Sequence, residues 1–516
     1  MVSIMRTINS IKNISFGLIS QLTSTLIAFV TRTIFIYILG VEYLGIQGLF
    51  TNILSILSLA NLGFGTAIVY SLYKPISEKN TKEIKAYMNL YKKFYRIVAS
   101  IVLIVGIALI PYLDKVVNLN INVNENLYII YFMFLMESVV SYLCIYKQSI
   151  LIASQKSYYI SKIHTYFLIL SNFMQIIILV TTKAYIPVLT IQILLRVIEN
   201  IIISKKADKK FPYLKDYVID MGLSHEKKKA LYKNVYSMFM YKISGTIINS
   251  TDNIVISYFI GVVYVGIYSN YILILSTLKT FVSYIFSSLT ASVGNLVVSK
   301  ENKKKKEIFD LIFFISFWIY GVLSIILFII INEFIEIWLG SSFLLSKFTV
   351  FIIILDFYTA GMQSAATMYR DTTGMFSVGK YRPIIASILN LLISILLVQK
   401  LKIAGVLLGT IISRLCVYFW FDPYIIYKNI FKEDVKKYFI KYFLYCIILL
   451  ATTLITSNLC KLVMVHNSYL NILLKFIICS LIPNIFFIIV FFKSREFKSL
   501  IGSLKIILII IKRKLD

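Results

Sequence analysis

The sequence carries little charge for its length. Only 15% of its 516 residues are Asp, Glu, Lys or Arg, whereas 59% are hydrophobic and the mean hydropathy is +0.83. Roughly a quarter of the residues in a soluble domain are charged. A soluble fold of this composition would expose large apolar patches to water. The shortage of charge therefore excludes a water-soluble protein and predicts a chain covered by lipid.

Cysteine is scarce, and its placement excludes a zinc site or a disulfide framework. The cysteines lie in or beside apolar runs, without CxxC spacing or a histidine partner. They are Cys144, Cys416, Cys446, Cys460 and Cys479. Walker, HExxH and GxSxG motifs are also missing, and GFGTAI at 63–68 lacks the last glycine of a dinucleotide loop. We predict no metal, no cofactor and no enzymatic activity.

The first residues, MVSIMRTINSIKN, lack the features of a cleavable signal peptide. They contain little basic charge, and no small-residue cleavage site precedes the first long apolar run. We therefore expect that run to be retained as a helix.

Long apolar runs fill most of the remaining sequence. A transmembrane helix needs about 20 mostly apolar residues, and this length predicts about fourteen spans. They cover residues 14–38, 44–70, 94–112, 127–151, 161–181, 186–204, 236–260, 265–298, 310–331, 347–369, 382–399, 403–427, 439–457 and 469–492. The predicted fold class is an all-α polytopic membrane protein.

The net charge of +29 is concentrated in short segments between these spans. Segments 71–96, 205–235, 300–306 and 428–441 are rich in lysine and fall on one side under the fourteen-span count. The opposite loops carry only Lys115, Lys183, Lys400, Lys402 and Lys461. This positive-inside bias predicts a multi-pass protein with both termini in the cytoplasm. It also accounts for the basic charge without nucleic acid as a partner.

Two segments of the sequence resemble each other. Residues 30–58 align without a gap with residues 251–279. The shared positions include Tyr37/Tyr258, Gly40/Gly261, Val41/Val262, Tyr43/Tyr264 and Gly45/Gly266. Both copies begin inside and turn outside, so the repeat is parallel and its axis follows the membrane normal.

The repeat predicts how the domains are organised. Residues 1–204 and 236–427 would form two six-helix bundles around a central cavity, joined by the basic cytoplasmic linker 205–235. Residues 428–492 would add two transmembrane helices, and the basic tail 493–516 would lie at the membrane interface. Proteins with such parallel repeats bind their cargo between the two halves and alternate access by rocking them.

Charged residues inside predicted spans are costly and therefore mark candidate functional positions. The basic ones are Arg32, Arg196, Lys242, Lys279 and Arg414, and the acidic ones are Glu137, Glu199, Asp252 and Asp356. Arg196 and Glu199 are three residues apart on one helix and are expected to pair. The sequence assigns no role to Arg414 or Glu137.

Polar residues recur at helical spacing in the four spans of the repeated pairs. Small residues in such stripes are explained by close helix packing, but packing does not require Arg32 or Lys279 near mid-span. Lys242 could instead extend to the cytoplasmic interface, and Asp252 could pair with Arg32 or Lys279. The candidate cavity residues are Arg32, Lys279, Lys242, Asn61, Asn249 and Asn253. A cationic cavity favours an anionic cargo such as a phosphate or diphosphate.

Three stretches carry a resemblance to a known family. They are RTIFIYILGVEYLGIQGLF from 32, NLGFGTAIVYSLYKPISE from 61 and TDNIVISYFIGVVYVGIYSNY from 251. Together with the length and span count, they resemble the oligosaccharide-repeat-unit flippases of the polysaccharide transporter family. That family belongs to the superfamily that also includes multidrug and toxin extrusion exporters and the peptidoglycan lipid flippase.

The resemblance implies a function. Such proteins move undecaprenyl-diphosphate-linked sugars from the inner to the outer leaflet of the bacterial cytoplasmic membrane, for surface polysaccharides such as capsule or O-antigen. A polymerase and glycosyltransferases of the same pathway would be partners. By the same resemblance, Arg32 and Lys279 match the family's cationic cavity positions. Cargo release would be linked to a proton or sodium gradient, with Asp252 or Asp356 as the coupling residue.

Three alternatives compete with this interpretation. A drug or cation exporter of the same superfamily predicts an acidic cation site, whereas the carboxylates here are scattered. A membrane polysaccharide polymerase or glycosyltransferase needs a sizeable outer loop, and the largest ones hold only Asp114, Glu125, Glu333 and Glu336 as acidic residues. A scaffolding protein would not need buried cations or a parallel repeat.

Overall fold

The structure is a computed structural model, and every element in its described part is a helix. It describes residues 2–58, 64–117, 123–214, 223–297, 302–373, 378–379, 381–463, 465 and 467–502. Within these ranges, the side chains of 2–19, 64, 66, 143–144, 237–238, 240–244, 249, 287–297 and 302–303 are not described.

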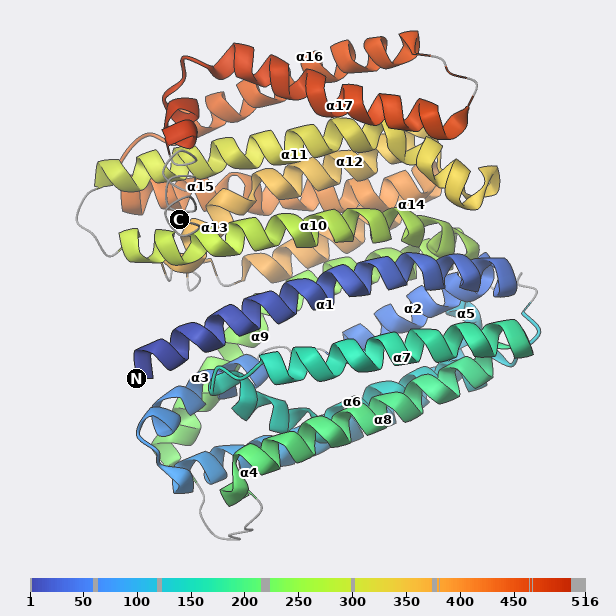
Figure 1. Cartoon of the computed structure of the whole chain (residues 1–516), viewed down its shortest axis with the longest axis vertical. Helices are drawn as coiled ribbons and strands as arrows, with labels where there is room; N and C mark the ends of the chain where they lie inside the picture. The colour runs from blue at the N-terminus through green and yellow to red at the C-terminus, as the bar shows by residue number, and fades with distance from the viewer. Residues whose placement is uncertain are drawn as a thin grey trace, which may run out of the picture. The chain divides into compact units, whose positions relative to one another are not determined.

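The described residues form two compact units, Met1–Ser269 and Asn270–Asp516 (Figure 1). The long helices of the first unit are α1 (Val2–Leu39), α2 (Val41–Leu57), α3 (Phe64–Ser77), α4 (Thr81–Leu109), α6 (Leu127–Ala153), α7 (Tyr158–Thr182), α8 (Tyr185–Lys210) and α9 (His225–Phe259). A short helix, α5 (Leu113–Val117), follows α4. The helix α10 (Val262–Val297) begins in the first unit and continues in the second.

The second unit contains the remaining elements. They are α11 (Asn302–Leu339), α12 (Lys347–Met362), α13 (Ser364–Thr372), α14 (Arg382–Arg414), α15 (Phe421–Ile426), α16 (Lys436–Leu462) and α17 (Ser468–Phe491). π-helical turns at Leu415–Phe419 and Tyr427–Phe431 flank α15. The two additional C-terminal helices predicted over 428–492 correspond to α16 and α17, which pack against each other and against α11.

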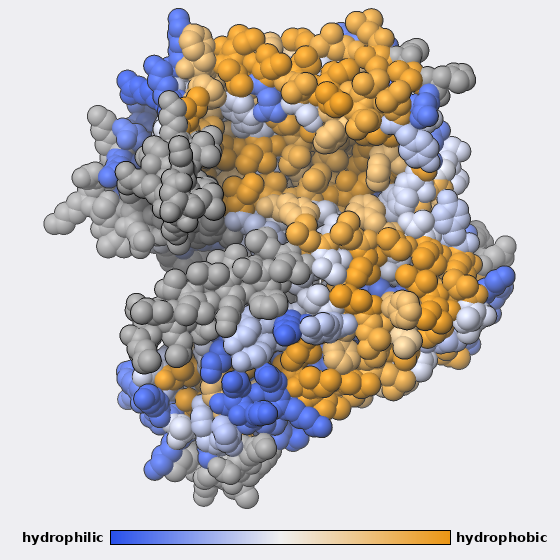
Figure 2. Space-filling model, in the orientation of Figure 1, coloured by the Kyte–Doolittle hydropathy of each residue, from blue (hydrophilic) through white to orange (hydrophobic). Residues whose placement is uncertain are grey.

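The described helices are long and apolar enough for a membrane protein. Ten of them could cross a bilayer, or eleven when the bent pair Leu127–Tyr142 and Ile145–Ala153 is taken as one span. Large apolar side chains cover an outward side of α16 at helical spacing, including Phe443, Ile447 and Leu454, each 60% to 66% exposed. Figure 2 shows the same apolar surface along the long helices. Lipid must cover these side chains, so the chain is a multi-pass membrane protein.

One of these ten ranges, Arg382–Phe431, contains two predicted spans, 382–399 and 403–427. Lys402 has a non-helical backbone with φ 51° and ψ −132°. Ser394 Oγ donates to the Val406 carbonyl at 3.0 Å, and Asn390 Nδ2 donates to Thr410 Oγ1 at 2.8 Å. Residues 12 and 20 positions apart cannot meet in a straight helix that rises 1.5 Å per residue. The chain therefore folds back at Lys402.

The predicted spans 44–70 and 236–260 include residues or side chains outside the described part. The total of fourteen spans therefore stays a prediction. The boundary between the compact units lies in α10, and α9 packs on α2 and α3 in the first unit. The proposed halves 1–204 and 236–427, the linker 205–235 and the interfacial tail 493–516 likewise stay predictions.

Aromatic packing organises each unit. In the first, the fully buried Tyr185 at the start of α8 meets Phe35 and Tyr43 edge-on, with ring centroids 5.2 and 5.5 Å apart. In the second, buried phenylalanines recur along α11 at steps of three and four. Phe317 stacks on Tyr445 of α16 with centroids 4.3 Å apart. Burying large rings between helices supplies much of the apolar contact that holds the units together.

The backbone shows the repeat predicted from residues 30–58 and 251–279. Gly40 and Gly261 occupy equivalent positions, and both have positive φ values, 93° and 124°, where one helix ends and the next begins. Glycine adopts this left-handed region without the penalty that a side chain would bring. The same two glycines therefore make the same sharp break in both copies.

The second pair of repeated glycines forms a reciprocal contact between α2 and the first turns of α10. A Cβ on Gly45 would lie 2.0 Å from the Val262 carbonyl oxygen, and one on Gly266 would lie 2.4 Å from that of Val41. Val41 and Val262 are themselves equivalent positions in the repeat. A two-fold axis produces such reciprocal contacts, in which each copy's glycine meets the valine of the other copy. A local pseudo-two-fold axis therefore passes through this glycine contact.

Candidate functional site

Three helices of the second unit bring charged side chains together inside their membrane spans. Arg414 at the end of α14 places Nη1 2.7 Å from Oδ1 of Asp356 on α12. The same nitrogen donates to the Asp356 carbonyl at 3.2 Å and to Thr359 Oγ1 at 3.0 Å. Lys279 on α10 places Nζ 3.9 Å from Asp356 Oδ2. Two cations thus share one carboxylate.

The two cations of this cluster are held differently. Arg414 is nearly enclosed, with 18% of its side chain exposed, and it makes several short contacts. The Lys279 side chain is 44% exposed, and its ion pair lies at the edge of contact distance. Its ammonium also lies 5.8 Å from the centre of the Phe357 ring. Arg414 is therefore the closer and more enclosed partner of Asp356, and Lys279 is the more exposed and more loosely held cation of the cluster.

In the first unit, Arg32 is half-buried within α1 and binds the start of α10. Its Nη1 donates to the Ser269 carbonyl at 2.8 Å, and Nη2 donates to Ser269 Oγ at 3.0 Å. No carboxylate of the described residues lies within 4.0 Å of its guanidinium. Among the described residues, Arg32 is therefore held by neutral acceptors. The next residue back, Thr31, donates to Asn172 of α7 at 2.8 Å.

A second charged network joins α6, α7 and α8. Arg196 Nη1 lies 3.2 Å from Glu199 Oε2, which confirms the pair predicted from their spacing. Arg196 Nε also lies 3.9 Å from Glu137 Oε1, so this pairing supplies the role that the sequence did not assign to Glu137. His164 Nδ1 lies 2.9 Å from Glu199 Oε1. No sequence pattern pointed to His164, because its partner is 35 residues away on another helix.

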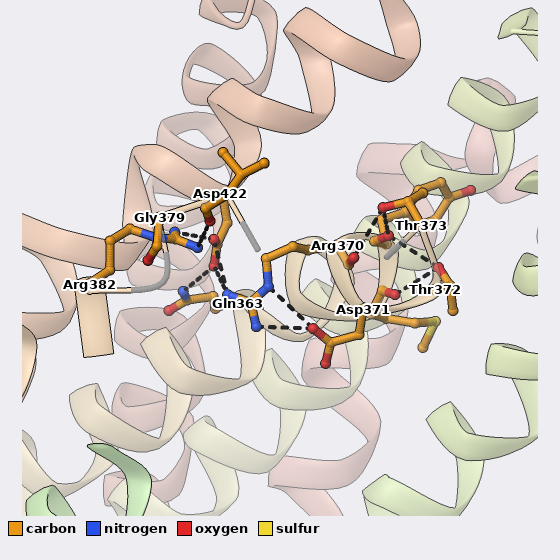
Figure 3. A network of polar contacts seen from close by, with 11 residues as sticks. Gln363, Arg370, Asp371, Thr372, Thr373, Gly379, Arg382 and Asp422 are labelled. Carbon is orange, nitrogen blue, oxygen red and sulfur yellow. Dashed lines mark hydrogen bonds and ion pairs between the residues drawn. The ribbon is translucent and has the colours of Figure 1, made fainter. Parts of the chain in front are cut away.

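A third network, also missed from the sequence, surrounds Asp422 in the second unit (Figure 3). The Asp422 side chain is fully buried between Arg370 of α13 and Arg382 of α14. Arg370 Nη1 lies 3.2 Å from both carboxylate oxygens, and Arg382 Nη1 lies 2.5 Å from Oδ1. Gln363 Nε2 donates to Oδ2 at 3.3 Å. The guanidinium of Arg382 also lies 4.0 Å from the centre of the Phe421 ring. These contacts fix three helices to one another.

The other predicted site residues have varied surroundings. Asn253 on α9 is half-buried, and its buried Oδ1 has no hydrogen-bond donor among the described residues. Asp252 beside it is buried. Asn61 and the side chains of Lys242 and Asn249 lie outside the described part. Arg32 and Lys279 belong to different compact units, and their common cavity stays a prediction.

No group of three or more His, Cys, Asp and Glu side chains in the described ranges is placed to hold a metal ion. Cys460 and Cys479 lie side by side on α16 and α17, with Sγ atoms 3.6 Å apart as free thiols.

Comparison with known proteins identifies the fold. No protein-family model matches the sequence, and no curated protein matches it either. Among solved structures, the lipid II flippase MurJ in an inward closed conformation superposes with a TM-score of 0.61 at 17% identity. The match covers 93% of this chain and 99% of that one.

Two multidrug transporters give similar results. An inward-facing multidrug resistance MATE family transporter of the MOP superfamily has a TM-score of 0.60 at 14% identity, covering 77% of this chain and 93% of that one. A point mutant of the Vibrio cholerae MATE transporter VcmN has a TM-score of 0.56 at 13% identity, covering 83% and 99%. The chain therefore has the helical membrane fold that MurJ and MATE transporters share.

Proposed function

We propose that this protein is a flippase for undecaprenyl-diphosphate-linked oligosaccharide repeat units in the cytoplasmic membrane of a bacterium. It would work by alternating access and would supply units for a surface polysaccharide such as capsule or O-antigen. The observation that carries this proposal is Lys279, a half-exposed cation inside a span whose neighbouring carboxylate is already paired with Arg414. A cation at that depth is costly unless it meets water or an anion.

Several features support an anionic cargo. Arg32 is held by neutral oxygens of Ser269, so no carboxylate of the described residues competes with a cargo for its guanidinium. Arginine and lysine bind diphosphates through charge-assisted hydrogen bonds, and the guanidinium fork fits phosphate oxygens in pairs. The fold similarity to a lipid II flippase is compatible with a lipid-linked cargo. Asn253 Oδ1, which has no donor among the described side chains, would accept a hydrogen bond from a cargo hydroxyl.

The remaining parts of the proposal rest on topology. The basic segments would face the cytoplasm, with both termini on that side. The halves 1–204 and 236–427 would rock about the cargo, and Lys242, Asn61 and Asn249 would line the same cavity. A proton or sodium gradient would drive release, with Asp252 or Asp356 as the coupling residue. Glycosyltransferases would supply the cargo, and a polymerase would receive it.

The competing function is export of drugs or other organic cations, which MATE-like folds also support. The side-chain chemistry argues against it, because the exposed charge at the Asp356 cluster is an ammonium group. A cationic drug would be repelled by Lys279 unless Asp356 were released from Arg414.

Alanine substitutions test the two functions against each other. We expect Lys279→Ala and Arg32→Ala to reduce surface polysaccharide at least about tenfold, since each removes a charge-assisted contact to the cargo. Lys279→Arg should retain most of it. Lys347→Ala is the matched control, because Lys347 is an exposed lysine at the start of α12. Surface polymer that survives in both variants while dye efflux is lost would establish the exporter instead.

A further inference from the structure

A groove between α7 and α8 concentrates lysine side chains at one end of these helices. It has a volume of about 410 Å³. The lining residues are Tyr159, Lys162, Ile163, Tyr166, Ile202, Lys205, Lys206 and Lys209. Figure 2 shows hydrophilic side chains gathered over this part of the first unit, directly beside apolar surface. None of its lining residues belongs to the charged networks described above, and the His164–Glu199 pair lies close by on the same two helices.

The four lysines of the groove are not neutralised within the described part of the protein. None of them lies within 4.0 Å of a carboxylate there. The acidic residue closest in sequence, Asp208, instead pairs with Lys147 of α6 at 2.6 Å. Holding four ammonium groups around one concavity costs electrostatic energy. An anion bound in the groove would recover that energy.

Tyrosine rings position these ammonium groups without neutralising them. Lys206 Nζ lies 4.6 Å from the centre of the Tyr159 ring, and Lys162 Nζ lies 6.0 Å from that of Tyr166. Cation–π contacts of this kind orient a lysine and leave its N–H donors available. Tyrosine is also typical of the membrane–water interface, where one end of the side chain is apolar and the other is wet.

The groove continues into an apolar surface along the same two helices. Further along α7, Leu170, Phe173 and Ile177 are exposed, and on α8 Leu194 and Ile198 are exposed. Ile163 and Ile202 line the groove itself. A soluble anion would use the lysines alone. A lipid would use both surfaces, with its phosphate on the lysines and its acyl chains along the helices.

We propose that this groove binds the headgroup of an anionic membrane phospholipid, with the acyl chains lying on the exposed sides of α7 and α8. The lysine-rich end would face the cytoplasm under the positive-inside rule, where anionic lipids meet basic side chains. Topology requires lysines near this end of the helices, but it does not require four of them to line one groove with an apolar floor. Through this site, the first unit would bind the anionic lipids of the surrounding bilayer.

Lipid binding by the full-length protein tests this proposal and does not depend on transport. Purified protein is titrated with phosphatidylglycerol against a phosphatidylcholine background, and bound lipid is counted by native mass spectrometry. The groove variant replaces Lys162, Lys205, Lys206 and Lys209 with Gln. The matched control replaces with Gln four exposed lysines outside the groove, Lys79, Lys82, Lys229 and Lys436, so that the net charge changes equally. We expect about tenfold weaker phosphatidylglycerol binding for the groove variant only.

Two results would overturn the proposal. The first is an equal loss of phosphatidylglycerol binding in the groove variant and in the control variant, which would show that net charge alone explains the binding. The second is competition by soluble glycerol 3-phosphate as strong as that by the lipid, which would make the groove a site for a free anion. Single variants Lys205→Gln and Lys206→Gln carry the same test if the fourfold variant does not fold. Surface polysaccharide that survives in Lys279→Ala and Arg32→Ala, with normal lipid binding by the groove, would count against the proposed function and not against the groove.

Discussion

At the scale of single residues, the membrane-embedded charges fall into two kinds according to how their partners are arranged. Asp422 has two arginines and an amide around a fully buried carboxylate, so every group in that network is satisfied. Lys279 shares its carboxylate with a better-placed arginine. The first arrangement fixes helices to one another, and the second is the one that the proposed cargo binding would use.

The Asp422 network gives a prediction about stability. Asp422→Asn would leave the buried Arg382 guanidinium without a counter-charge among the described residues and Arg370 with only the partly exposed Asp371. Removing one partner of a buried ion pair typically costs about 3 kcal/mol. We therefore expect the free energy of unfolding to fall by about that amount, seen as a lower unfolding temperature in detergent.

Asp371→Asn is the control for this prediction. Asp371 also pairs with Arg370, but 40% of its side chain is exposed, so solvent screens the pair and its loss should cost less than about 1 kcal/mol. Equal destabilisation by the two variants would show that the buried position of Asp422 has no special energetic role.

At the scale of helices, the clearest device is the reciprocal contact of Gly45 and Gly266. Each glycine has no side chain at the point where the backbone carbonyl of the opposite helix approaches. The contact therefore depends on both glycines, and a single methyl group on either would push α2 and α10 apart. Small residues permit this kind of close approach between membrane helices.

Gly45→Ala tests this contact. A Cβ 2.0 Å from the Val262 oxygen cannot be accommodated without moving the helices. We expect a loss of about 2 kcal/mol in stability, comparable with overpacking a core. Gly245→Ala on α9 is the control, because no atom of the described residues lies within 4 Å of its added Cβ. That variant should be neutral or slightly stabilising, since alanine favours a helix by about 1 kcal/mol over glycine. Similar unfolding temperatures for the two variants would contradict the contact.

Much of the helical layout could be predicted from the sequence, for a physical reason. In lipid each span must satisfy its own backbone hydrogen bonds, so long apolar runs become helices wherever they occur. The break at Gly40 and Gly261 was signalled by the repeat, and both glycines have positive φ. Lys402, predicted to lie in a loop, is where the chain reverses between two spans.

The pairing of side chains could not be predicted in the same way. Asp356 and Arg414 are 58 residues apart, and His164 and Glu199 are 35 apart, so their contacts depend on how helices pack. Arg196 with Glu199 was the exception, because residues three apart on one helix are neighbours. Lys279 could be identified as a candidate from the sequence because it lies near the middle of a predicted span. The role of Arg414 depends on its contact with Asp356 on α12, which the sequence does not reveal.

At the scale of the whole molecule, a transporter-type fold is combined with cations inside its spans. The fold is shared with a lipid II flippase and with MATE transporters, which carry different cargoes. Fold alone does not select among cargoes. The selection rests on chemistry, and in particular on whether Arg32 and Lys279 meet water and an anion within the bilayer.

Cysteine accessibility measures this most directly. In a variant without its five native cysteines, Arg32→Cys and Lys279→Cys are each treated with a charged, membrane-impermeant thiol reagent on inside-out vesicles. Reaction requires the thiolate and therefore water. Ile447→Cys, on the apolar exposed side of α16, is the lipid-facing control. We predict that positions 32 and 279 react and that position 447 does not react. Failure of 32 and 279 to react above that control would contradict a hydrated cationic cavity.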